Sequence, residues 1–288
     1  MEHPDYNSPI ALKAFLDANG MAMQKKFGQN FLVNASARRV LADALGVSAG
    51  VSVWEVGPGL GAMTAELLSR GASVTAFEID YGFSRLLRSF FGGTERFTLV
   101  EGDFLRTWRG ALADGALPGR FIGNLPYNAA AVMLADLIAG GARFDRAVVT
   151  VQKEVGQRIC ARPATVGYSS LSVLCQWAYD VRTLIDLAGG SFWPRPNVES
   201  RALVLERRAD FPRCKNPTLF MRLSRALFAS RRKTVRNNLL PLLPRGVSAE
   251  AVLSDCGVAP TERAEHLDIP ALLALSDSLD SAILASES

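Results

Sequence analysis

The sequence predicts an α/β fold with a mostly parallel, seven-stranded sheet, followed by a small all-α domain. Short β-rich runs alternate with helical runs from Val51 onward, as in sheets that are covered by helices on both faces. The first of these strands ends in a glycine-rich turn at Gly57–Gly61. After about Arg208 the chain contains helical patterns and no clear strand.

The elements follow one another in a regular order. A short amphipathic helix is predicted between Ser8-Pro9, which is a favourable helix start, and Gly20, which is a favourable stop. A second helix is predicted at 35–45. Strands are then expected at 51–56, 73–77, 97–100, 121–122 and 147–151, with helices at 62–69, 83–90 and 129–139. A final antiparallel pair at 181–187 and 202–206 completes seven strands.

The change of pattern near residues 207–215 predicts two domains. Residues 1–208 would form an N-terminal extension and the α/β domain, and residues 209–288 a helical domain. Helices are expected there at 219–229, 233–240, 248–255 and 270–284.

Charge is distributed unevenly along the chain. The formal net charge is only +4, but the stretch 211–245 contains no acid. It holds nine basic side chains, namely Arg213, Lys215, Arg222, Arg225, Arg231, Arg232, Lys233, Arg236 and Arg245. From Gly246 to the end there are eight acids and one arginine. This asymmetry is consistent with a polyanionic partner and equally with a solvated basic face.

Several classes of site and location are not expected. The four cysteines are far apart in sequence and form no C-x-x-C pair, and the two histidines are too few for a histidine-based metal site, so neither a disulfide framework nor a metal is predicted. The first ten residues lack a basic region followed by an apolar run, and the most apolar stretch, 129–138, is short and contains Asp136. A cytoplasmic protein without a membrane span is therefore expected.

A glycine-rich turn after the first strand predicts a nucleotide-containing ligand. Its sequence is Glu55-Val56-Gly57-Pro58-Gly59-Leu60-Gly61. Glycines at a strand-to-helix turn, such as Gly57 and Gly59, let a ligand approach the backbone closely. Glu78, at the end of the second strand, suits the two hydroxyls of a ribose. Both features are also typical of dehydrogenases that bind NAD, so they leave that alternative open.

Asp103 favours S-adenosylmethionine over NAD. It follows the third strand at the same edge of the sheet, where a carboxylate can accept a hydrogen bond from the amino group of the cofactor adenine. A glycine turn, a ribose acid and an adenine acid at successive strand ends fit a Rossmann-like, S-adenosylmethionine-dependent methyltransferase domain.

The segment after the fourth strand indicates that the methyl group is transferred to N6 of an adenine. Its sequence is Gly123-Asn124-Leu125-Pro126-Tyr127-Asn128. The N6 amine of adenine is a poor nucleophile because its lone pair is delocalised into the ring. The side-chain oxygen of Asn124 and the carbonyl of Leu125 can accept hydrogen bonds from that amine, and Pro126 stiffens the loop. Tyr127 offers a flat face for stacking of the target base.

Taken together, these motifs resemble the ribosomal RNA adenine N6-dimethyltransferase family over nearly the whole chain, in particular its small-subunit (16S) branch. The family's first motif resembles the segment Lys25-Lys26-Phe27-Gly28-Gln29-Asn30-Phe31-Leu32. This resemblance implies that Asn30 and Leu32 contact the cofactor. The other cofactor contacts that it implies are Gly57, Glu78, Asp103 and Asn124. The segment 151–155 resembles its fifth-strand motif. The segment 192–200 resembles the loop whose phenylalanine faces the motif tyrosine, so Phe192 and Tyr127 would sandwich the target adenine.

The resemblance also implies the reaction and the partner. The chain would transfer methyl groups from S-adenosylmethionine to N6 of two adjacent adenosines near the 3′ end of small-subunit rRNA, giving N6,N6-dimethyladenosine. The substrate would be a pre-assembled small subunit late in ribosome assembly, and the enzyme a monomer. Segments 228–239 and 263–265 resemble the family's helical domain. The residues expected to bind RNA are Lys25, Lys26, Arg231, Arg232, Lys233 and Arg236.

Beside the dehydrogenase that binds NAD, three alternatives remain open from the sequence. A large-subunit rRNA methyltransferase of the antibiotic-resistance type would share the site and differ mainly in the helical domain. A non-catalytic ribosome-assembly or transcription factor could use the same fold, although the intact segment Asn124–Tyr127 argues against it. Methyltransferases of glutamine amides or DNA adenine usually carry two prolines before the aromatic residue, and here Leu125 takes the first of these positions.

Overall fold

The computed structural model describes residues 2–21, 23, 29–113 and 115–287. The chain divides into two compact units, which we describe separately. The first contains residues 1–136, 144–156 and 182–206, and the second contains residues 137–143, 157–181 and 207–288. The two earlier segments of the second unit, 137–143 and 157–181, are not part of the C-terminal domain predicted from the sequence. The predicted division into 1–208 and 209–288 stays a prediction.

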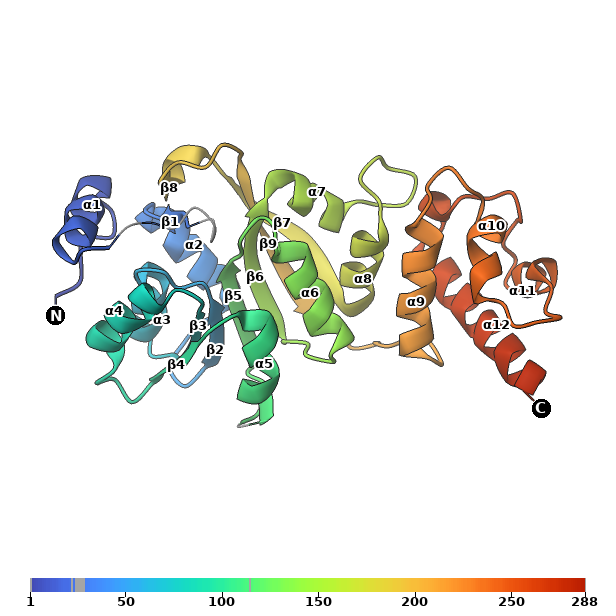
Figure 1. The fold of residues 1–288 in the computed structure, drawn as a ribbon, viewed down its shortest axis with the longest axis horizontal. Helices are drawn as coiled ribbons and strands as arrows, with labels where there is room; N and C mark the ends of the chain where they lie inside the picture. Colours follow the sequence, from blue (N-terminus) through green and yellow to red (C-terminus); the bar gives the residue numbers. More distant parts are fainter. Residues whose placement is uncertain (1, 22, 24–28, 114, 288) are drawn as a thin grey trace. The chain divides into compact units, whose positions relative to one another are not determined.

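A seven-stranded sheet forms the centre of the first unit (Figure 1). Its strand order is β4-β3-β2-β5-β6-β9-β7, and the pairs from β4 to β6 are parallel, whereas β9 runs antiparallel to β6. The predicted mostly parallel, seven-stranded sheet is therefore confirmed. The strands are β2 (Ser52–Val56), β3 (Ser73–Glu78), β4 (Phe97–Glu101), β5 (Arg120–Asn124), β6 (Arg146–Gln152), β7 (Tyr179–Leu187) and β9 (Ser200–Arg207).

Side-chain alternation along these strands buries both faces of the sheet. Val53 of β2 belongs to an aliphatic core with Leu41 of α2 (Ala35–Leu45) and Leu67 of α3 (Ala62–Ser69). The next residue, Trp54, points to the other face, where its ring packs edge-on against Phe77. Further helices of this unit are α4 (Tyr81–Phe91), α5 (Phe104–Ala113) and parts of α6 (Ala130–Ala139) and α7 (Lys153–Cys160). A sheet buried on both faces leaves its carboxyl edge as the place for a ligand.

The N-terminal segment belongs to this unit. Helix α1 (Pro9–Ala18) begins after Ser8, whose hydroxyl accepts a hydrogen bond from the amide of Ala11, as the sequence predicted. Leu12 and Leu16 of α1 are buried in a cluster with Phe83 of α4. The short strand β1 (Phe31–Leu32) pairs antiparallel with β8 (Phe192–Trp193), which follows the 3₁₀ turn Gly189–Ser191.

The second unit is helical over most of its length. It contains α8 (Ser170–Ala178), α9 (Pro217–Phe228), α10 (Val235–Leu239), α11 (Ala249–Asp255) and α12 (Ile269–Glu287), with 3₁₀ turns at Leu240–Leu242 and Ala264–His266. Helix α9 packs against α8, α10 and α12. Among the residues that the structure describes, α12 is the one helix whose length and hydropathy reach those of a membrane span, but core helices of water-soluble proteins meet the same criteria.

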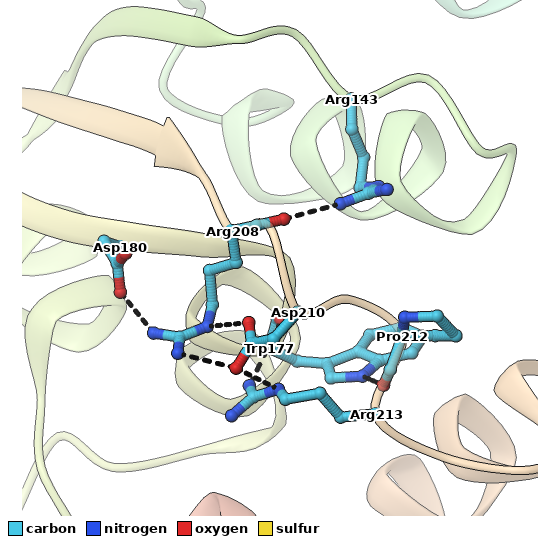
Figure 2. A network of polar contacts seen from close by, with 7 residues as sticks. All are labelled: Arg143, Trp177, Asp180, Arg208, Asp210, Pro212 and Arg213. Carbon is cyan, nitrogen blue, oxygen red and sulfur yellow. Dashed lines mark hydrogen bonds and ion pairs between the residues drawn. The ribbon is translucent and has the colours of Figure 1, made fainter.

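A polar network fixes residues 208–213 within the second unit, as Figure 2 shows. The guanidinium of Arg208 donates to both carboxylate oxygens of Asp210, over 3.0 and 3.1 Å, and also pairs with Asp180. The indole of Trp177 donates to the carbonyl of Pro212, and Arg143 lies 3.6 Å over the ring centre of Phe211. The segment where the sequence pattern changes is therefore held by side-chain contacts and is not an unattached linker.

Candidate functional site

The carboxyl ends of β2, β3, β4 and β5 surround a pocket of about 350 Å³. At or just after the end of each of these strands lies a residue that the sequence singled out. Of the predicted site residues, the lining includes Asn30, Gly57, Gly59, Glu78, Asp103, Asn124 and Pro126. The structure thus gathers residues that lie as much as 96 positions apart in the sequence, between Asn30 and Pro126. Leu32 lines a second, smaller cavity that shares Asn30, Gly57 and Asn124 with the first.

The glycine turn after β2 is shaped for close approach. Gly57 and Gly59 have φ angles of 71° and 57°, in the left-handed region where a side chain is strained. A Cβ atom on Gly59 would lie 2.8 Å from the ring of Phe31. The turn therefore requires glycine for both its backbone conformation and its packing.

Glu78 links this turn to β3. One carboxylate oxygen accepts a hydrogen bond from the amide of Gly59 (3.0 Å) and the other from the amide of Asp80 (2.8 Å). The side chain is buried, and this desolvation raises the pKa of Glu78 to about 7. Each oxygen still has a lone pair that can accept a hydrogen bond from a hydroxyl in the pocket.

Asp103 lies at the start of α5, where one carboxylate oxygen accepts a hydrogen bond from the amide of Leu105 (3.0 Å). Its side chain is 37% exposed, and the second oxygen lies 3.9 Å from Nε of the exposed Arg106, which leaves room for a further donor. Apolar side chains that the sequence reasoning missed complete this end of the pocket, namely Ile79, Phe83, Phe104, Leu105 and Met133. Ile79, Phe104 and Leu105 directly follow the motif acids in the sequence, and this position was the signal that could have identified them. Two carboxylates facing an apolar slot match the donors and the flat ring of an adenosine.

Asn124 lies where β5 ends. Its side-chain nitrogen donates to the backbone carbonyl of Asn30 over 2.8 Å. Only the NH₂ side of an amide can donate to a carbonyl, so this bond fixes the orientation of the amide and presents Oδ1 as an acceptor. The amide of Leu125 donates to the carbonyl of Thr150 (3.0 Å), and no described residue donates to the carbonyl of Leu125. Both acceptors that the sequence predicted are thus held in place.

Tyr127 is half-buried, and its hydroxyl lies 2.6 Å from the hydroxyl of Ser200, the first residue of β9. Phe192 is buried in the aliphatic core, where its backbone pairs with Leu32. Among the described ring contacts there is none between Tyr127 and Phe192, and neither residue lines the pocket. The predicted sandwich of the target base by these two rings stays a prediction. The two residues hold the opposite ends of the loop 192–200.

The basic residues predicted to bind RNA fall into three groups. Lys25 and Lys26 lie outside the described residues. Arg231 donates to the carboxylate of Glu265 (2.8 and 3.0 Å), and Arg236 pairs with Glu250. Arg232 and Lys233 are exposed, and no described acid pairs with either. The acidic stretch of the sequence therefore neutralises part of the basic stretch within the second unit. Arg222 and Arg225, on the exposed face of α9, were not selected from the sequence.

No metal site is present among the residues described. No group of three or more His, Cys, Asp or Glu side chains is arranged to hold a metal ion there. None of the four cysteines forms a disulfide bond.

Comparison with known proteins places the chain in a defined group. The sequence model of the family described as "Ribosomal RNA adenine dimethylase" matches residues 20–281. A protein of Treponema pallidum named "Ribosomal RNA small subunit methyltransferase A" is 46% identical over 281 residues, which cover 96% of this chain and 98% of that protein.

Two solved structures share the fold. A dimethyladenosine transferase from Plasmodium falciparum superposes with a TM-score of 0.71 at 23% identity, over 84% of this chain and 94% of that chain. The 23S rRNA methyltransferase ErmE superposes with a TM-score of 0.63 at 25% identity, over 87% of this chain and 100% of that chain.

Proposed function

The chain belongs to the ribosomal RNA adenine dimethylase family, and from this we propose that it transfers methyl groups from S-adenosylmethionine to N6 of two adjacent adenosines in small-subunit (16S) rRNA. The product would be N6,N6-dimethyladenosine near the 3′ end of that RNA, formed on a pre-assembled small subunit late in assembly. The observation that carries the proposal is the loop after β5, where Asn124 is oriented by the carbonyl of Asn30.

The described residues fit the proposed cofactor. The glycine turn supplies a surface that a Cβ atom would obstruct, and Glu78 and Asp103 supply acceptors for the ribose hydroxyls and the adenine amine. Asn30, Leu32, Gly57, Gly59 and Asn124 would contact the remainder. When bound, S-adenosylmethionine supplies an electrophilic methyl group on a sulfonium.

The chain's own contribution is binding and orientation. Oδ1 of Asn124 and the carbonyl of Leu125 would accept hydrogen bonds from the N6 amine of the target adenine, which disfavours delocalisation of its lone pair. Pro126 limits the movement of these acceptors, and the ring of Tyr127, with Phe192, would hold the base. No general base is required, because the aminium formed on N6 is strongly acidic and loses its proton to water.

A large-subunit rRNA methyltransferase would share this site, so an experiment must distinguish it from a small-subunit enzyme. The relative from Treponema pallidum is named for the small subunit, and it matches the chain over 96% of its length, including the helical region. We therefore favour the small subunit over the large one, and a catalyst over an assembly factor without activity.

The test is transfer of labelled methyl groups from S-adenosylmethionine to small subunits that lack the modification, followed by nucleoside analysis. Large subunits and free rRNA are assayed in parallel. We expect N6,N6-dimethyladenosine in the small subunits. Label in large subunits alone would favour the rival enzyme, and binding to small subunits without any label would favour an assembly factor.

A further inference from the structure

Trp193 is an aromatic side chain that has no role in the proposed function. It is the second residue of β8, and its side chain is partly exposed, whereas its neighbour Phe192 is buried. The other three tryptophans of the chain are at most 4% exposed, namely Trp54, Trp108 and Trp177. A partly exposed indole combines a large apolar face with a polar N–H group, so it suits a ligand that is itself flat and polar at its edges.

The indole lies at the end of a row of aromatic rings that begins in the larger pocket. Phe83 lines that pocket, and its ring packs edge-on against Phe31 with the ring centres 5.5 Å apart. Phe31 lines both cavities and pairs with Trp193 across β1 and β8. The two rings are stacked, with their centres 6.1 Å apart and an angle of 27° between their planes. Phe31 therefore supports the indole at the rim of the site.

Trp193 is also connected to the residues proposed to act on the target base. It directly follows Phe192 in the chain, and its partner Phe31 directly follows Asn30. The carbonyl of Asn30 accepts the hydrogen bond that orients Asn124. Both connections are one residue long, so the indole lies close to the place where the target adenine would bind.

The same loop supplies a positive charge. Arg195 is exposed, and none of the described ion pairs includes it. Its side chain folds back to the 3₁₀ turn before β8, where a Cβ atom on Gly189 would lie 2.8 Å from Nε of Arg195. Proteins hold single-stranded nucleic acid with aromatic faces that stack on the bases and with cations beside the phosphates. Trp193 and Arg195 together offer both groups.

We propose that Trp193 stacks on the nucleotide next to the target adenosine, and that Arg195 binds a phosphate beside it. This inference rests on the proposed function, in which two adjacent adenosines are modified: while one is in the site, the other is available to the indole. Trp193 is then a specificity-determining residue, because it favours RNA in which the neighbour of the target is also unpaired.

Kinetics on small subunits that lack the modification test the role of the indole. The neighbouring nucleotide does not react, so stacking stabilises the bound substrate and the transition state equally, and its loss raises KM without lowering kcat. We expect Trp193→Ala to raise KM for small subunits about tenfold, while kcat changes less than about twofold. Trp193→Phe, which keeps a flat ring, should restore KM to within about threefold of the parent value.

Two controls accompany these variants. The affinity for S-adenosylhomocysteine, measured by calorimetry, should change less than about twofold in both, because neither cavity is lined by Trp193. Tyr81→Ala removes another exposed ring, which is 71% exposed and lines neither cavity, and it should match the parent in KM and kcat. Arg195→Gln should reduce the slope of log affinity against log salt by about 0.7, as for one phosphate of a single strand.

Fluorescence gives a signature that packing alone does not produce. The enzyme is labelled with 5-hydroxytryptophan, which can be excited selectively in the presence of RNA and ribosomal proteins. Because the other three indoles are buried, a base can stack only on the one at position 193. Small subunits should quench the emission of the parent and of Trp108→Phe, the matched control, and should quench that of Trp193→Phe much less.

An unchanged KM in Trp193→Ala would overturn the inference, as would equal quenching of the parent and Trp193→Phe. A joint loss of kcat and of affinity for S-adenosylhomocysteine would show that Trp193 only packs, and an unaltered salt slope would exclude Arg195. If Trp193→Ala does not fold, the quenching of Trp193→Phe decides. Failure of the parent itself to methylate small subunits would refute the proposed function, whereas normal transfer by the parent and by Trp193→Ala would refute this inference alone.

Discussion

The side-chain nitrogen of Asn124 lies 2.8 Å from the backbone oxygen of Asn30, and this hydrogen bond joins two motifs that are 94 residues apart. Asn30 precedes β1, and Asn124 ends β5. Both line the larger pocket and the smaller cavity. The residue proposed to orient the substrate amine is therefore fixed by a residue proposed to contact the cofactor.

Replacing Asn124 with alanine should lower turnover much more than cofactor affinity. The substitution removes an acceptor for the N6 amine, and loss of one such oriented group typically lowers kcat by about 10²-fold or more. The bond to Asn30 is lost as well, so S-adenosylhomocysteine should bind less than about tenfold more weakly. Single-turnover methylation and calorimetry measure the two effects. An unchanged single-turnover rate together with lost cofactor binding would contradict the proposed role.

Tyr127→Phe and Ser200→Ala should have similar, non-additive effects. Each removes one partner of the 2.6 Å hydroxyl contact that attaches the loop of Tyr127 to β9. We expect each to reduce the free energy of unfolding by about 1 kcal/mol, and the double variant to lose little more. Tyr127→Ala should in addition abolish most activity, because it removes the ring that would hold the base. Urea unfolding and methyl transfer are the measurements, and additive losses in the double variant would show that the contact is not made.

Stability without cofactor should depend on pH through Glu78 and Glu55. Burial raises the pKa of each carboxyl from 4.5 to about 7, so the folded chain holds protons that the unfolded chain releases. The free energy of unfolding should therefore fall as the pH rises from about 4.5 to about 7, and then level off. Each group contributes on the order of 3 kcal/mol to this fall.

Glu78→Gln should remove part of this decline, since glutamine does not titrate. Urea unfolding at several pH values between 5 and 8 measures the slope of the free energy of unfolding against pH in the parent protein and in the variant. Glu66→Gln provides a control, because Glu66 is a partly exposed carboxylate that pairs with Arg70. A slope in Glu78→Gln that equals the parent slope would show that Glu78 is not titrating in this range.

RNA binding should respond differently to the free and the paired basic residues. Replacing Arg232 and Lys233 with alanine should reduce the slope of log affinity against log salt by about 1.8, if each neutralises one phosphate. Conversely, Glu265→Gln should release Arg231 from its ion pair and strengthen binding. Filter binding at several salt concentrations measures both changes. An unaltered slope in the double variant would exclude these two residues from the contact with RNA.

Much of the sheet was predictable because the parallel strands are short apolar runs, and most of them end at or next to a glycine or an acidic residue. Three helices were not predicted, namely α5, α7 and α8. In α8 nearly every side chain from Leu171 to Ala178 is buried, so the polar face that marks an amphipathic helix is absent. Its start at Ser169, where the side chains of Ser169 and Ser172 form a capping box, is a local signal that hydrophobic periodicity does not register.

The residues of the larger pocket were predictable because parallel strands bring their carboxyl ends to one edge. The position of Tyr6, which lines the smaller cavity, was not predictable, because it depends on packing of the N-terminal segment against α4, about 70 residues later in the chain. The pairing of Arg231 with Glu265 was not predictable for the same reason. The sequence shows two stretches of opposite charge, and only the fold of the second unit brings individual members into contact.

The loop from Phe192 to Ser200 is attached at both ends, by the pairing of Phe192 with Leu32 and by the contact of Ser200 with Tyr127. A segment attached in this way loses its conformational entropy while the chain folds, and not when a substrate arrives. Ordering of this loop therefore costs little free energy when the substrate binds. The rate at which the RNA associates should then be limited by the approach and rearrangement of the RNA, and not by ordering of this part of the protein.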